Sequence, residues 1–176
     1  MSKPLLLAVA LATLAAAAQT QTQALAAEPP KFIPRARGPA TALAVEGAMA
    51  ALAACVEKYK AQDTALIADS AGGTVALIGN DGAPLKSQEV AASKVATVIK
   101  YKMSSGAVLA KTLTDPALAA AIKADPKIEV ARGGGIPIMV GGEMIGVFAI
   151  AGTPLGGDRD ESCAQVGLDK IQSRLK

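Results

Sequence analysis

The run Arg132-Gly133-Gly134-Gly135-Ile136-Pro137 joins a cationic side chain to three consecutive glycines. Consecutive glycines let backbone N–H groups converge on an anion, and an adjacent guanidinium can form paired hydrogen bonds to a carboxylate or phosphate. The run lacks the lysine and the spacing of a Walker A loop and does not fit GxGxxG, so nucleotide binding is not indicated. We therefore predict contact with an anionic ligand, the alternative being glycines that only let a loop enter a strand.

Lys94 is the second candidate for ligand contact. It lies in a segment of helical spacing, on an apolar stripe that includes Val90, Val95 and Val98. A lysine on such a face must reach water, a carboxylate or a ligand. The alternative is that its aliphatic stem runs along the helix surface to solvent.

The chain contains no histidine, which excludes Ser-His-Asp and Cys-His catalysis and histidine-based zinc sites. Asp158-Arg159-Asp160-Glu161 carries three carboxylates, but Asp158 and Glu161 have the spacing of a capping box. The stretch also fails the EF-hand pattern. We expect these acids to cap a helix, and we predict neither catalytic residues nor a metal site.

The elements that must position these residues can be read from apolar spacing and turn residues. We expect helices over 41–60 with Thr41 as cap, over 86–103, over 116–124 with Asp115 as cap, and after 158. Two hairpins are expected, one turning at Ala71-Gly72-Gly73 and one at Gly141-Gly142, a pair suited to a type I′ turn. A fifth strand is expected over 128–131. This order predicts the α+β class, with an antiparallel sheet and segregated helices.

The first 26 residues are typical of a secretory signal peptide. One lysine precedes an apolar run, which is too short to span a bilayer, and Ala24-Leu25-Ala26 fits a cleavage site. We expect an exported, periplasmic or secreted protein with no membrane span after cleavage. Residues 27–40 contain four prolines and are predicted to form an extended arm, and residues 41–176 form one domain.

The formal net charge is only +3, and the chain has two Phe, two Tyr and no Trp. Scattered charges and so few stacking side chains argue against a nucleic-acid partner.

Several motifs occur in the order that they have in one known family, covering roughly residues 41 to 176. They are Asp69-Ser70-Ala71-Gly72-Gly73, Asp81-Gly82-Ala83-Pro84, Ala91-Ala92-Ser93-Lys94-Val95-Ala96-Thr97 and the glycine-rich stretch from 133 to 164. The chain resembles the GlcG/HbpS-like family, described as haem-binding or haem-degrading, and also the C-terminal domain of some corrinoid adenosyltransferases.

The resemblance implies a five-stranded sheet similar to profilin and PAS folds, a ring-like octamer, and a pocket near the end of the second long helix. Tyr101 and Met103 lie there and join Lys94 and residues 132–137 as candidate cofactor contacts. Haem propionates would suit the glycine run. Without histidine, iron ligation would have to come from Tyr59, Tyr101, Met103, Met139, Met144, a cysteine or a lysine.

The resemblance also places the helices of Cys55 and Cys163 side by side on one face of the sheet. We expect two buried free thiols, with a disulfide as the open alternative in an oxidising periplasm.

These features predict an exported oligomer that binds haem or a related planar or anionic small cofactor, as a non-catalytic carrier or sensor accessory. The alternatives are an accessory or scaffold protein of a secreted oxidoreductase system, or a haem-degrading enzyme.

Overall fold

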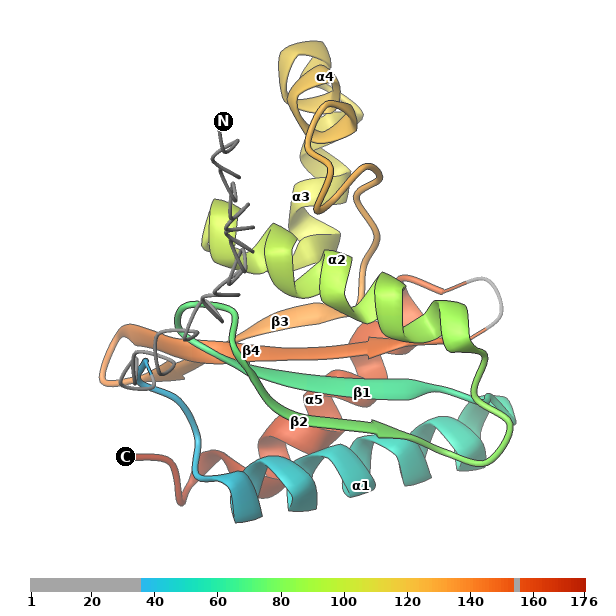
Figure 1. Ribbon diagram of the computed structural model, residues 1–176, viewed down its shortest axis with the longest axis vertical. Helices are drawn as coiled ribbons and strands as arrows, with labels where there is room; N and C mark the ends of the chain where they lie inside the picture. The colour runs from blue at the N-terminus through green and yellow to red at the C-terminus, as the bar shows by residue number, and fades with distance from the viewer. Residues whose placement is uncertain (1–35, 154–155) are drawn as a thin grey trace, which may run out of the picture. The chain divides into compact units, whose positions relative to one another are not determined.

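The computed structural model describes residues 36–153 and 156–176 (Figure 1). The expected signal peptide and most of the expected arm lie outside these residues. Within them, no helix is both long and apolar enough to cross a membrane.

The described chain contains four strands and five helices. In chain order they are α1 (Thr41–Tyr59), β1 (Thr64–Asp69), β2 (Thr74–Gly79), α2 (Leu85–Tyr101), α3 (Ser105–Thr112), α4 (Pro116–Lys123), β3 (Gly135–Val140), β4 (Glu143–Ala151) and α5 (Asp158–Gln172).

The four strands form one antiparallel sheet in the order β2-β1-β4-β3. The turn between β3 and β4 consists of Gly141 and Gly142, both with positive φ (58° and 82°), as a type I′ turn requires. The central strands β1 and β4 come from distant parts of the sequence, and their pairing brings residue 64 opposite residue 151. The loop that follows β4 and the loop that precedes β1 therefore lie next to each other, at the same end of the two central strands.

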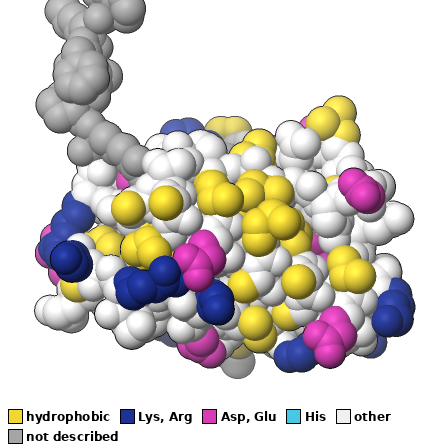
Figure 2. Space-filling view, turned by 90° about the horizontal axis from the view of Figure 1, so that it is seen from below, with side chains coloured by type: hydrophobic (Ala, Val, Ile, Leu, Met, Phe, Trp, Pro, Cys, Tyr) yellow, Lys and Arg dark blue, Asp and Glu magenta, His cyan; other side chains and the backbone are white. Residues whose placement is uncertain are grey.

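Helices cover both faces of the sheet, with α1 and α5 on one side and α2 on the other (Figure 1). Phe148 and Ile67 belong to the buried cluster under α1 and α5, whereas Val147 and Leu66 belong to the cluster under α2. This alternation follows from the two-residue period of a strand. Figure 2 shows apolar side chains on the outer surface of the α1–α5 layer as well, where Met49 is 56% exposed.

The expected strand over 128–131 is wrong, because the sheet has four strands. The backbone N–H groups of Ile128 and Glu129 both donate to the carbonyl of Asp125, and Glu129 has a φ of +58°. Local turn hydrogen bonds thus replace a strand ladder. Ile128 is nevertheless buried, against Val108 and Ile122.

The expected capping residues are right for α4 and wrong for α1 and α5. The side chain of Asp115 accepts a hydrogen bond from the Leu118 N–H at the start of α4. Thr41 is the first residue inside α1, and Asp158 the first inside α5; neither helix has a side-chain cap. Two acids of the α5 start contact residues from other parts of the chain, since Asp160 pairs with Lys94 and Glu161 accepts from the Gly134 N–H.

Cys55 of α1 and Cys163 of α5 form a disulfide, with their Cα atoms 5.6 Å apart. The expectation of free thiols is therefore wrong. The bond joins the two helices on one face of the sheet and closes a loop with a sequence separation of 108.

Candidate functional site

A pocket of about 540 Å³ opens between α2, the segment before β3 and the loop after β4. Its polar lining includes Lys94, Arg132, Thr153 and Asp160, and its apolar lining includes Val90, Leu109 and Ala131. Gly133, Gly152, Gly156 and Gly157 also line it. It brings together three of the predicted contacts, Lys94, Arg132 and Gly133, from elements far apart in the sequence.

Lys94 forms a buried ion pair with Asp160 at the base of this pocket. Its side chain is 1% exposed and that of Asp160 is 3% exposed. The Lys94 Nζ donates to Asp160 Oδ2 at 2.5 Å and to the Ile150 carbonyl at 2.6 Å. Lys94 therefore reaches a carboxylate, one of the three destinations that its position on an apolar stripe allows.

The pKa of Lys94 depends on its burial and on three charged neighbours, Asp160, Asp63 and Arg132. Burial lowers the pKa of its ammonium below the usual value, and the positive charge of Arg132 adds to that effect, while Asp160 opposes it. Arg132 and Lys94 both line the pocket. A fixed positive charge thus lies under the pocket floor, balanced by a carboxylate.

The polar network continues from Asp160 to Asp63. The Thr153 N–H donates to Asp160 Oδ1 at 3.3 Å, and the Thr153 hydroxyl donates to Asp63 Oδ1 at 3.1 Å. Asp63 is fully buried, and its Oδ2 has no hydrogen-bond partner among the described residues. Burial raises the pKa of the Asp63 carboxyl to about 6, and the charge of Asp160 adds to the rise.

Gly134 allows the chain to pass directly over the ion pair. Its φ is +111°, and a Cβ there would lie 2.7 Å from Lys94 Nζ and 2.5 Å from the Cβ of Asp160. Its N–H donates to Glu161 Oε2 at 3.3 Å, and the Gly135 N–H donates to Ser105 Oγ at 2.8 Å. These two amides are used within the protein, so Arg132 and Gly133 are the members of the glycine run that face the pocket.

Ile136 and Pro137 lie within β3, opposite Phe148 and Val147 of β4. Ile136 is buried in the core under α1 and α5. Neither residue lines the pocket.

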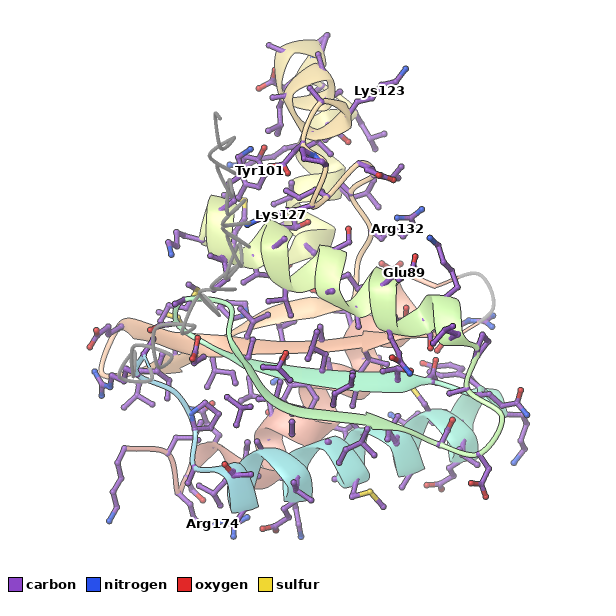
Figure 3. The ribbon with its side chains drawn as sticks, in the orientation of Figure 1. Glu89, Tyr101, Lys123, Lys127, Arg132 and Arg174 are labelled. Carbon is purple, nitrogen blue, oxygen red and sulfur yellow. A yellow bond between two sulfur atoms is a disulfide. The ribbon has the colours of Figure 1, made fainter. Side chains whose placement is uncertain are left out.

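Arg132 is exposed, and its Nη1 lies 3.4 Å from the Val130 carbonyl that accepts its hydrogen bond. Figure 3 shows Arg132, in the segment before β3, near Glu89 of α2 and far from Arg174 near the C-terminus. Arg132 lines the pocket, and a guanidinium can hold a carboxylate through paired hydrogen bonds.

Tyr101 and Met103 lie outside this pocket. Both pack against the buried residues Val108, Ile122 and Ile128, which we call the α3–α4 cluster. The Tyr101 hydroxyl is buried and has no hydrogen-bond partner among the described residues.

Sequence reasoning missed Asp63, Thr153 and Asp160. The acidic run around Asp160 fits a local helix-start pattern, so sequence reasoning looked for no partner of Asp160 elsewhere in the chain and missed its contact with Lys94. The signal that could have found it was Lys94, since a lysine on an apolar face needs a carboxylate. Asp63 and Thr153 carry no such signal, because their contact depends on the pairing of β1 with β4. Among the described residues, no group of three or more His, Cys, Asp or Glu side chains could hold a metal ion.

A sequence model of the family described as "Haem degrading protein HbpS-like" matches residues 40–169. The crystal structure of HbpS is similar to this chain, with 26% identity and a TM-score of 0.66, covering 82% of this chain and 97% of that one. No curated protein compared with the chain matches it.

Two further solved structures share the fold. ORFY of Klebsiella pneumoniae has 19% identity and a TM-score of 0.68, over 84% of this chain and 99% of that one. PduOC, crystallised as a complex with haem, has 21% identity and a TM-score of 0.60, over 73% and 91%.

Proposed function

This chain belongs to the HbpS-like family, and we propose that it binds haem or a related planar, anionic small cofactor as a carrier or sensor accessory. The observation that carries the proposal is the pocket in which Arg132 and the buried Lys94 meet an apolar wall of Val90 and Leu109. Ligand pockets typically combine such walls with a few convergent polar groups.

The residues fit the acidic edge of a haem. Arg132 can hold a propionate at the pocket mouth, while Val90, Leu109 and Ala131 can contact the ring. The volume of about 540 Å³ lies in the range of roughly 300 to 1,000 Å³ usual for ligand sites. When bound, haem would supply a redox-active iron. The residues of the pocket offer that iron no ready ligand, so the proposal assigns binding to them and no chemistry.

Export and assembly are part of the same proposal. The signal-peptide pattern of residues 1–26 supports a periplasmic or secreted protein. The resemblance to the GlcG/HbpS-like family supports a homo-oligomer, such as an octamer.

A haemin titration followed by absorbance tests the proposal. We expect a saturable Soret shift, weakened about tenfold or more by Arg132→Ala because one charge-assisted pair is lost. Arg174→Ala is the matched control, since it removes an arginine that pairs with Glu46 away from the pocket. Absence of a saturable shift in the unmodified protein would contradict haem binding.

Tyr101→Phe and Met103→Ala locate the site independently. Because both residues pack against the α3–α4 cluster and do not line the pocket, we expect the haemin affinity of each variant to be unchanged. A selective loss in either variant, with Arg132→Ala unaffected, would move the site to that cluster.

The family description favours a second candidate function, haem degradation. It predicts that haemin bound to the protein is consumed over many turnovers when a reductant and oxygen are supplied. If haemin remains intact and no open-chain product forms, haem degradation is contradicted and only the binding function is supported.

A further inference from the structure

The chain's cysteine, tyrosine and methionine side chains, which are usual haem-iron ligands, lie away from the pocket that contains Arg132. The sequence has no histidine and holds two cysteines, two tyrosines and five methionines. All of these except Met1 fall in the described residues, and none of those eight lines the pocket. A haem seated there would find none of these usual axial ligands in the pocket lining.

Each of the eight side chains has another place in the fold. Both cysteines are consumed in the disulfide. Tyr59 packs against the core under α1 and α5, and Met144 against the cluster under α2. Tyr101 and Met103 belong to the α3–α4 cluster. The remaining two, Met49 and Met139, are exposed on α1 and on the edge strand β3.

Lys94 lines the pocket but is committed to its ion pair. A lysine binds iron through its neutral amine, so ligation would require the loss of the proton that bonds Asp160 Oδ2. That would leave Asp160, which is 3% exposed, without its compensating charge. Breaking a buried pair in this way is strongly unfavourable.

The groups that do face the pocket suit carboxylates and a ring. Arg132 offers guanidinium donors, and it is the cation left for a ligand carboxylate because the charge of Lys94 is offset by Asp160. Asp158 and Asp160 also line the pocket, but Asp160 is neutralised by Lys94. Apolar side chains of α2 and α3 form the opposite wall through Val90 and Leu109.

We propose, on the basis of the function proposed above, that this pocket recognises a planar tetrapyrrole through its carboxylates and its ring, and not through a coordinated metal. The affinity for a tetrapyrrole then does not depend on whether it carries iron. A metal-free porphyrin dicarboxylate is as good a ligand as haem.

Three probes test this on the full chain: haemin, metal-free protoporphyrin IX and protoporphyrin IX dimethyl ester, whose carboxylates are blocked. Calorimetry gives all three dissociation constants, and porphyrin fluorescence checks the two metal-free ones. We expect haemin and the free acid to bind within about threefold of each other, and the ester about tenfold or more weakly. Arg132→Ala should weaken haemin and the free acid by the same factor, with Arg132→Lys intermediate and Arg174→Ala unchanged.

The outcomes separate the two proposals. If haemin binds saturably but the metal-free acid binds more than about thirtyfold more weakly, metal coordination dominates and the inference is wrong while the proposed function stands. The same holds if ester and acid bind equally, or if Arg132→Ala changes neither ligand. If none of the three probes binds saturably, the proposed function itself fails.

Discussion

At the scale of single residues, the best-defined feature is the ion pair between Lys94 and Asp160. Both side chains are almost fully buried. Lys94 also donates to the Ile150 carbonyl near the end of β4, and Asp160 accepts from the Thr153 N–H in the loop after β4. The pair therefore fixes α2 and the start of α5 against the end of β4. A buried charge pair of this kind positions elements more than it stabilises them.

Lys94→Met should lower the free energy of unfolding by about 3 to 5 kcal/mol, because Asp160 is left buried without its counter-charge. Lys86→Met is the control, since Lys86 pairs with Glu89 at the surface, where such a pair contributes less than about 1 kcal/mol. Urea unfolding measures both. The double variant Lys94→Met/Asp160→Leu should recover most of the loss; equal effects of the two single lysine changes would contradict this account.

Asp63 makes stability depend on pH in the opposite direction to an ordinary paired carboxylate. Its folded pKa of about 6 lies above the usual value of 3.8 for an aspartate. Between these values the folded state keeps the proton that the unfolded state has released, so this contribution to the free energy of unfolding falls as pH rises and is constant above about pH 6.

Asp63→Asn removes this contribution. The variant should be more stable than the wild type near pH 7.5, by at most about 3 kcal/mol, and equally stable near pH 4. Urea unfolding across this range gives the difference between the two proteins, in which the titration of other carboxylates cancels. A difference that does not change with pH would contradict the raised pKa.

Sequence alone singled out Lys94 and Arg132, which line the pocket, but not the buried polar residues that bond to one another beneath it. A lysine within an apolar stripe and an arginine beside three glycines are local patterns, visible in the chain. Asp63, Thr153 and Asp160 meet through the pairing of β1 with β4, and no local pattern encodes that contact.

At the scale of elements, predictions succeeded where local turn chemistry decides the structure. The hairpin at Gly141-Gly142 and the start of α4 at Asp115 depend on residues next to one another in the chain. The strand expected over 128–131 failed, because this segment forms a turn that buries Ile128 and Ala131 and leaves Val130 exposed. Apolar alternation by itself does not distinguish the two.

The crossing of α1 and α5 depends on two glycines packed over Phe148. A Cβ on Gly167 would lie 2.5 Å from Phe148 Cζ and 2.6 Å from the Gly47 carbonyl oxygen, whereas a Cβ on Gly47 would lie 3.0 Å from its nearest atoms. Gly167→Ala should therefore destabilise the protein by about 1 to 3 kcal/mol, despite the better helix propensity of alanine.

Gly47→Ala is the matched comparison and should cost less, because its contacts are looser. Thermal or urea unfolding of the two variants measures the order. If Gly167→Ala is neutral or stabilising, the helices can separate without loss and the crossing is not tightly specified.

At the scale of the whole molecule, the disulfide and the expected signal peptide bear on the same question of compartment. Disulfides persist in oxidising compartments and are rare in the bacterial cytoplasm. The bond between Cys55 and Cys163 therefore agrees with export, and it ties the first helix of the domain to the last. The identity of the ligand, in contrast, cannot be inferred from the disulfide or the signal peptide, since one fold serves many ligands.

The full chain expressed in a bacterium should be recovered from the periplasm, cleaved after Ala26 or Ala27, with both cysteines oxidised. A chain lacking residues 1–26 should remain in the cytoplasm with two free thiols and be less stable by about 4 to 5 kcal/mol, because the unfolded state is no longer constrained by the 108-residue loop. Intact mass after alkylation without reduction reports both the cleavage site and the number of free thiols.

The control is the variant Cys55→Ser/Cys163→Ser. It should be equally stable from either compartment, which assigns the difference in stability to the disulfide. Recovery of an uncleaved chain would contradict the signal peptide, whereas two free thiols in a cleaved, periplasmic chain would contradict the disulfide alone.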